Sequence, residues 1–366
     1  MRAILLAAAL LMPLSAEAQV PCPVPEPGTL HIATFNVFRL GNLAKEYTDH
    51  IEDGIDTGVI PERVKNLARI LAAGRFDLVA FQEVTDGAPG RRVMDDLVEV
   101  LASDHAMTYQ YFLSDHIGRG LMPEAIAFLF NPDSVRPEIV ARENSLAENI
   151  EIGGRDLVRT QWEAGSFDFT LISAHLAWGN EGDRDEGYQK IDQIFTAPRP
   201  SAFSIDDDII VLGDFNRFGK GYDSVKELEF DGSFLAPNVT LFDPDFNERK
   251  DVRKSHIVGK GIPNDDPQWL STTVAKNTFV YDMILLSPDV AEEYSGTADG
   301  SGFGTDWGIL HFDEAGGCGL QADAETLGHN ALKEAYSDHR PVWMRFRTDG
   351  DTADDGPGGI LLSSYE

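Results

Sequence analysis

Polar side chains that could bind a metal ion or transfer protons stand at the ends of apolar stretches of this chain. Asp214 and Asn216 close the run "VLGDFN". Residues two apart on a strand point to the same face of a sheet, so these two side chains would point to one spot. Five other positions have this character: Asn36, Glu83, His175, Asp282 and the pair Asp338–His339. Burying such groups without partners is costly, so the pattern predicts that they meet each other, water or an ion.

The residue types in this set suit the hydrolysis of a phosphate ester. Carboxylate and amide oxygens favour hard cations, which predicts Mg²⁺ or Mn²⁺. The sequence has no His-Glu-x-x-His motif and no cysteine cluster, so zinc is disfavoured. Two histidines with acidic partners could act as a general base and a general acid, while a metal ion neutralises developing charge. For any single position the alternative is a turn or capping residue.

Hydrophobic periodicity predicts alternating strands and helices around these positions. The predicted strands are His31–Phe38, Phe76–Val84, Ala125–Phe130, Phe167–His175, Asp208–Phe215, Val280–Leu286 and Arg340–Phe346. The predicted helices are Pro61–Ala73, about Arg91–Ser103 and Asp185–Phe195. Apolar strands packed by interspersed helices indicate a layered α/β or α+β sandwich.

The two ends of the chain differ from this pattern. Residues 1–18 have a positive start, a short apolar run and an A-x-A site, which predicts a signal peptide cleaved after Ala18. A lead-in (19–28), one catalytic domain (29–347) and a disordered acidic tail (348–366) follow. We therefore expect a secreted or periplasmic protein. Its two cysteines, Cys22 and Cys318, could form one bridge or remain free thiols.

The formal net charge is −31, from 30 basic and 61 acidic residues. Such a surface repels polyanions and argues against a tight nucleic-acid binder. It does not argue against an enzyme that meets a phosphate through a metal ion.

Six short motifs occur in the order that a known superfamily shows. They are "TFNV", "FQEV", "SAHL", "LGDFN", "YDMIL" and "SDHRPV". With them the chain resembles the endonuclease/exonuclease/phosphatase superfamily, which includes deoxyribonuclease I, sphingomyelinases and inositol-polyphosphate phosphatases. It is most similar to the deoxyribonuclease I-like branch. The resemblance implies an α/β (α+β) four-layer sandwich, in which two packed, mostly antiparallel β-sheets are flanked by helices.

The resemblance also implies roles for single residues. Glu83 would be the principal metal ligand, for Mg²⁺ or Mn²⁺ with Ca²⁺ as a further candidate. His339 would be the general base, oriented by Asp282, and His175 the general acid, oriented by Glu124. The remaining metal ligands would be Asn36, Asp338 and Asp214. The phosphate would be bound by Asn216, Arg159 and Asn36, with Asp214 also assisting catalysis.

The resemblance implies a phosphodiesterase, with a low-specificity endonuclease acting on DNA as the first hypothesis. The alternatives are a sphingomyelinase-like or other small phosphate-ester hydrolase, and a binding protein without turnover. Thr85 and Met122 stand where deoxyribonuclease I has its groove-reading arginine and tyrosine, which puts duplex DNA in doubt. Trp178 and Trp307 are assigned to the core, with membrane contact as the alternative. No stable protein partner is implied, so we expect a monomer.

Overall fold

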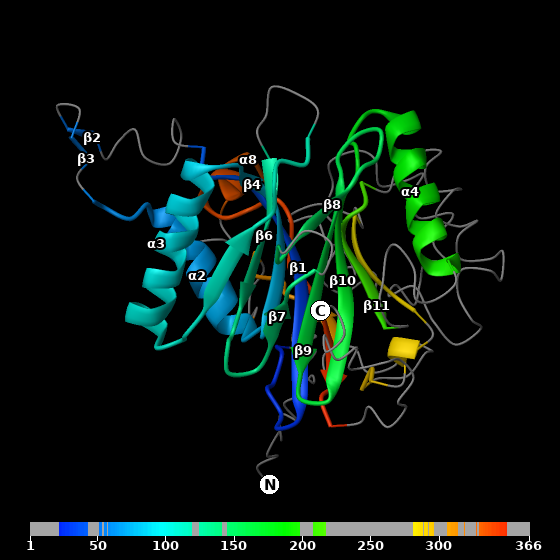
Figure 1. Ribbon diagram of the computed structural model, residues 1–366. Coiled ribbons are helices and arrows are strands. Elements are labelled where there is room, and N and C mark those ends of the chain that lie inside the picture. The colour runs from blue at the N-terminus through cyan, green and yellow to red at the C-terminus, as the bar shows by residue number, and fades with distance from the viewer. Residues whose placement is uncertain are drawn as a thin grey trace, which may run out of the picture.

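The computed structural model describes residues 22–42, 51–52, 55–56, 58–118, 124–140, 145–197, 208–216, 281–287, 289–291, 293–295, 306–313, 318, 327 and 329–349. Two six-stranded sheets face each other in it (Figure 1). The first sheet has the order β13-β14-β1-β4-β6-β5. Its strands are β1 (Thr29–Leu40), β4 (Leu78–Thr85), β5 (Gln110–Leu113), β6 (Glu124–Phe130), β13 (Trp307–Ile309) and β14 (Val342–Arg347).

The second sheet has the order β12-β11-β10-β9-β7, and β8 also pairs with β9. Its strands are β7 (Arg136–Glu138), β8 (Glu148–Ile150), β9 (Leu157–Ala164), β10 (Phe167–His175), β11 (Ile209–Asp214) and β12 (Asp282–Leu286). A separate pair joins β2 (Ile51–Glu52) to β3 (Ile55–Asp56).

Each large sheet contains one parallel strand pair, and its other pairs are antiparallel. The parallel pairs are β1–β4 and β10–β11. This arrangement confirms the predicted mostly antiparallel sandwich. It also matters for function, because parallel neighbours bring their carboxyl-terminal ends to the same edge of a sheet.

Helices cover the outer faces of both sheets (Figure 1). The helices are α2 (Glu62–Gly74), α3 (Ala88–His105), α4 (Glu181–Thr196) and α8 (His329–Ala335), with a short 3₁₀ turn η3 (Asp289–Ala291). The pair α2 and α3 lies against the first sheet, and α4 lies against the second. The layers therefore run helix, sheet, sheet, helix, as the resemblance implies.

Alternating side chains of β1 divide between two apolar cores. Leu30 and Ile32 point into the central core between the sheets. Ala33, Phe35 and Val37 point to the outer core beneath α2 and α3. Period-two alternation in the sequence therefore fixes the orientation of this strand, and Asn36 reaches the sheet interface at its end.

The amino-terminal lead-in is tied to the fold in two ways. Cys22 and Cys318 form a disulfide across a sequence separation of 296 residues, which decides between the two alternatives left open by the sequence. Thr348 N–H donates to the Gly28 carbonyl (2.9 Å), so the first residue of the predicted tail is held against the lead-in. The predicted signal peptide and the tail beyond residue 349 lie outside the described residues.

Within the described part of the chain, no helix is long and apolar enough to cross a membrane.

Candidate active site

The predicted site residues gather at one rim of the two sheets. Asn36 and Glu83 lie near the ends of the parallel strands β1 and β4, and His175 and Asp214 are register partners at the ends of β10 and β11. Asp282 opens the antiparallel strand β12 directly beside Asp214. Residues from both sheets thus meet at the rim that the two parallel pairs create.

The Oδ2 atom of Asp214 is the point on which three other side chains converge. Asn36 Nδ2 donates to it at 2.9 Å. His175 Nε2 lies 3.6 Å away and His339 Nε2 lies 3.8 Å away. Asp214 is only 2% exposed, so these polar neighbours take the place of water.

Asn36 joins Asp214 to Glu83. Its Nδ2 atom also donates to Glu83 Oε1 at 3.2 Å, and its Oδ1 atom accepts from Phe38 N–H at 3.0 Å. Glu83 has a left-handed φ of 62°, and the pairing of β4 with β6 shifts register between Phe81 and Val84. A non-glycine residue in this conformation is strained, and such strain is common at functional sites. The irregularity turns the Glu83 carboxylate to the rim.

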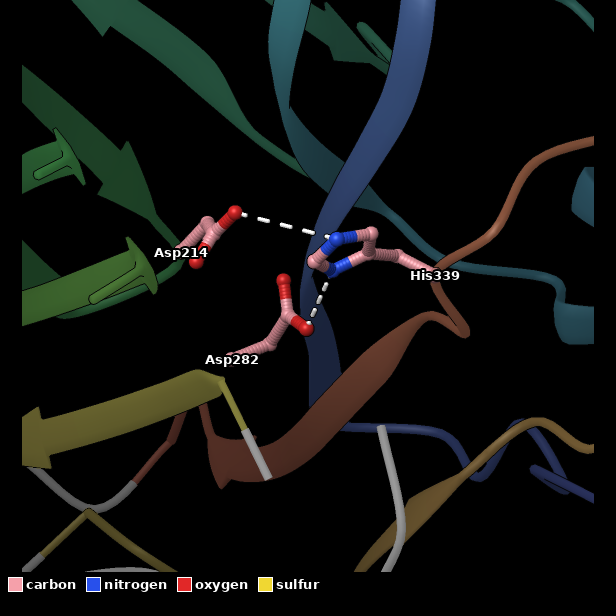
Figure 2. Close-up of side chains that lie close together, drawn as sticks. All are labelled: Asp214, Asp282 and His339. Atoms are coloured by element: carbon pink, nitrogen blue, oxygen red, sulfur yellow. Dashed lines mark hydrogen bonds and ion pairs between the residues drawn. The ribbon is translucent and has the colours of Figure 1, made fainter. Parts of the chain in front are cut away.

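The first proton-transfer candidate is the Asp282–His339 pair (Figure 2). His339 Nδ1 and Asp282 Oδ2 are hydrogen-bonded at 2.7 Å. Burial lowers the pKa of His339, but the carboxylates of Asp282, Asp214 and Asp338 outweigh it and raise that pKa well above its ordinary value. The imidazole is therefore held in place by one carboxylate while its Nε2 atom is directed at another.

The loop that carries His339 is attached to β1. Ser337 Oγ donates to the Asn36 carbonyl at 2.7 Å and accepts from His339 N–H at 3.1 Å. Ser337 was not singled out in the sequence, although it stands in the motif "SDHRPV". It fixes the backbone of His339 relative to Asn36.

The second proton-transfer candidate is the Glu124–His175 pair. His175 Nδ1 is hydrogen-bonded to Glu124 Oε1. Burial lowers the pKa of His175 and Glu124 raises it, while Arg155 lowers it again; the net shift is upward. Burial raises the pKa of Glu124, but His175 and Arg155 bring it below its ordinary value. These shifts favour the carboxylate form of Glu124 and the protonated form of His175.

Arg155 is a second residue that was not singled out in the sequence. Its Nε lies 3.1 Å from Glu124 Oε2, and its Nη1 lies 3.2 Å from both His175 Nε2 and the Leu176 carbonyl. Arg159, which was predicted to bind phosphate, is ion-paired with Glu148, and its role in phosphate binding stays a prediction. The contact of Arg155 with Glu124 arises only in the folded chain.

Asn216 is oriented by the segment that follows His175. One N–H of its side chain donates to the Leu176 carbonyl at 2.8 Å, and its backbone N–H donates to Asp214 Oδ1 at 2.8 Å. The described contacts of Asn216 therefore brace Asp214 and Leu176. Its role in phosphate binding stays a prediction.

Two sets of residues could hold a cation. The predicted set is Glu83, Asn36, Asp338 and Asp214, whose donors are all oxygens of the kind that Mg²⁺ and Mn²⁺ prefer. Asp338 Oδ1 is buried and accepts no hydrogen bond from the described residues, as expected of a ligand atom. The donor chemistry of this set therefore fits a hard divalent cation.

A second set offers one ligand atom each from Asp214, Asp282 and His339, all within 4.8 Å of one another (Figure 2). Here Asp282 and His339 already bond to each other, and His339 carries a raised pKa. A metal ligand must be deprotonated at the donor atom, so this pair suits proton transfer better than metal binding.

The two tryptophans have different surroundings. Trp307 is buried, as predicted. The assignment of Trp178 to the core is wrong, because its side chain is 70% exposed on the segment between β10 and α4. Met122 lies outside the described residues.

No family model and no curated protein matches the sequence. Among solved structures, a humanised TDP2 of D. rerio is similar at 15% identity and a TM-score of 0.50, covering 88% of this chain and all of that chain. An endonuclease/exonuclease/phosphatase family protein of Bacteroides thetaiotaomicron has 15% identity and a TM-score of 0.48, covering 89% of this chain and 100% of that one. The human Nocturnin catalytic domain has 12% identity and a TM-score of 0.46, covering 88% and 96%.

The chain has the fold of TDP2. The likeness to TDP2 extends over nearly the whole of both chains, and the two sheets with flanking helices agree with it. At this level of identity the likeness defines the fold alone, and the activity must be argued from the site.

Proposed function

We propose that the chain is a divalent-metal-dependent phosphodiesterase of the endonuclease/exonuclease/phosphatase superfamily that cleaves nucleic acid. One observation carries the proposal: two separate histidine–carboxylate pairs direct their Nε2 atoms at the same buried oxygen, Asp214 Oδ2. A reaction that takes a proton on one side of a phosphate and gives one on the other side needs both pairs.

The metal would be held by Glu83, Asp214, Asn36 and Asp338. When bound, Mg²⁺ or Mn²⁺ supplies the positive charge that offsets developing charge on the phosphoryl oxygens. Asn36 links the two carboxylates Glu83 and Asp214, so it keeps them together before any ion arrives.

His339 would accept the proton of the attacking water at Nε2, since Nδ1 is engaged by Asp282, and the charge of a bound cation would offset the carboxylates that raise the pKa of His339. His175 would donate a proton to the leaving oxygen from Nε2, since Nδ1 is engaged by Glu124. Its raised pKa favours the protonated form of His175, which a general acid requires. Arg155, 3.2 Å from the same Nε2, would bind the phosphate beside the leaving group.

Export is part of the proposal. The start of the sequence has the signal-peptide pattern, and the Cys22–Cys318 disulfide suits an oxidising compartment. We propose a secreted or periplasmic monomer that meets nucleic acid as substrate. The choice of nucleic acid rests on the motifs shared with the deoxyribonuclease I-like branch, and the net charge of −31 favours brief encounters over tight binding.

A substrate panel tests the proposal. Purified protein is incubated with single-stranded DNA, plasmid DNA, RNA, sphingomyelin and bis-nitrophenyl phosphate, each with Mg²⁺ or with EDTA. Metal-dependent cleavage of nucleic acid is expected. Turnover of sphingomyelin alone would replace the proposal with a lipid phosphodiesterase, and inactivity on every substrate would leave a binding protein.

A further inference from the structure

Trp178 is the most exposed of the large hydrophobic side chains in the described part of the chain. It is 70% exposed, compared with 57% for Ile139 and 47% for Val59. It follows His175 by three residues, and three trans peptide units separate the two Cα atoms by at most about 11 Å. A large aromatic surface therefore stands in water at the rim of the candidate active site.

The backbone that carries Trp178 is fixed. The Leu176 carbonyl accepts from Arg155 Nη1 at 3.2 Å and from Asn216 Nδ2 at 2.8 Å. The Ala177 carbonyl accepts from Arg184 Nη1 at 3.3 Å, and Arg184 is fully buried. Three polar side chains thus hold the two residues before Trp178, so the indole is presented from a braced segment rather than from a loose loop.

Two acidic residues follow Trp178 in the described part of the chain. Asn180 caps α4, and Glu181 and Asp183 stand in the first turn of that helix. These carboxylates repel phosphate groups, so a nucleic acid at Trp178 would contact it through an uncharged surface. The π-face of an unpaired nucleobase is such a surface, and base–aromatic stacking tolerates every base.

We propose that Trp178 stacks on an unpaired nucleobase on the leaving-group side of the scissile phosphate. The inference rests on the proposed function, because the leaving-group side is the side of His175. It makes single-stranded nucleic acid the favoured substrate, since a base inside a duplex has both faces covered by the stacked neighbouring pairs. It also gives a strongly acidic protein a contact with nucleic acid that does not depend on charge, in addition to the phosphate contacts at the site.

A membrane is the less favoured occupant of this surface. Interfacial binding needs an extended apolar face with basic residues around it. Trp178 is instead followed within five residues by Glu181 and Asp183.

Two dinucleoside phosphates test the proposal in the presence of Mg²⁺. One carries thymine on the leaving-group side, and the other carries an abasic tetrahydrofuran residue there. The wild-type protein is expected to prefer the thymine substrate in kcat/KM by about 5- to 150-fold, the range for stacking of one base. Trp178→Ala is expected to bring the ratio close to one, and Trp178→Phe to restore most of it.

Ile139→Ala is the matched control, because Ile139 is also an exposed apolar side chain but lies at the end of β7. It is expected to keep the wild-type ratio. An unchanged ratio in Trp178→Ala overturns the proposal. Sedimentation with phosphatidylcholine vesicles is the second readout: Trp178-dependent vesicle binding with an unchanged ratio would assign the residue to a lipid surface.

The outcomes separate this inference from the proposed function. A wild-type protein that cleaves both dinucleoside phosphates without preference contradicts the stacking role alone. A wild-type protein that cleaves neither contradicts the nuclease assignment, and the stacking role with it.

Discussion

Three buried histidines of this protein differ in the direction in which their surroundings shift the pKa. His31, at the start of β1, packs edge-on against Trp343 at 5.3 Å, and burial followed by the charge of Arg345 lowers its pKa to about 4. His175 and His339 are equally buried, yet their pKa values are raised. The difference is a directly bonded carboxylate, Glu124 or Asp282. Burial alone makes a neutral core histidine, and burial with a carboxylate makes a group that holds a proton.

The two histidine–carboxylate pairs also differ from each other. His339 has only carboxylates among the charges that shift its pKa, whereas His175 has Arg155 opposing Glu124. The two pairs therefore combine a histidine with a carboxylate in the same way but have different electrostatic surroundings. This asymmetry distinguishes the two histidines, and for His339 to serve as the base a bound cation would have to offset the carboxylates around it.

Replacing the histidines should have the largest effect. His339→Ala and His175→Ala are each expected to reduce kcat on an oligonucleotide by on the order of 10²–10⁴-fold, because each removes a positioned proton-transfer group. With bis-nitrophenyl phosphate the leaving group needs no acid, so His175→Ala should then lose less than about 10-fold, while His339→Ala keeps its full loss. Equal losses of both variants on both substrates would contradict the division into acid and base. His31→Ala, away from the rim, is the activity control.

Metal-binding measurements should distinguish the carboxylate that binds the ion from the carboxylate that is assigned to His339. Glu83→Gln is expected to weaken Mn²⁺ binding by more than about 10-fold, because it removes a first ligand. Asp282→Asn should leave the affinity within a few-fold, since Asp282 is assigned to His339. Calorimetric titration of both variants with Mn²⁺ measures the two affinities. The reverse order would place the ion among Asp214, Asp282 and His339 instead.

His31 should make stability depend on pH. Because its pKa in the folded protein is lowered from 6.5 to about 4, the unfolded chain binds the proton more tightly, and stability falls as pH decreases through this window. The full shift corresponds to about 3 kcal/mol. Denaturant unfolding of the metal-free protein between pH 7 and pH 4 should show a shallower pH dependence in His31→Phe than in the wild type. If stability depends on pH to the same extent in both proteins, His31 is not the source of the pH dependence.

Replacing Arg155 should have the smallest effect of these substitutions, and it should act on only one of the two histidine–carboxylate pairs. Arg155→Met is expected to raise the pKa of His175, because the guanidinium lowers it, and to leave His339 unchanged. NMR titration of the imidazole protons in the metal-free protein measures the pKa values of both histidines. Arg155→Lys keeps the positive charge, so the pKa of His175 should be lower in this variant than in Arg155→Met. A shift at His339 of the same size would mean that the variant disturbs the whole rim.

Much of the fold was predictable because the site lies on regular strands. β10 has the predicted bounds, Phe167–His175, and the ends of β1, β4 and β11 carry the predicted polar residues. Prediction failed for β9, which buries Arg159, Thr160 and Gln161 and so lacks an apolar alternation. It failed for Trp178 because a tryptophan is usually buried, and only the hydrogen bonds of Leu176 and Ala177 show that its segment is held at the surface.

The site itself was predictable as a set of residue types but not as a set of contacts. Motif order brings Asn36, Glu83 and Asp214 together, and the structure joins them through Asn36 Nδ2. The contact of Arg155 with Glu124 and His175 depends on tertiary geometry that no spacing in the sequence encodes.

Asp214 offers the most direct test, since both histidines and Asn36 converge on its Oδ2 atom. The measurement is Mg²⁺-dependent cleavage of a single-stranded oligonucleotide by the wild type and by Asp214→Asn, which keeps the shape and removes the charge. Metal-dependent cleavage by the wild type is predicted, with a loss on the order of 10³-fold in the variant and an intact unfolding transition. A folded Asp214→Asn protein with near wild-type activity would contradict the account.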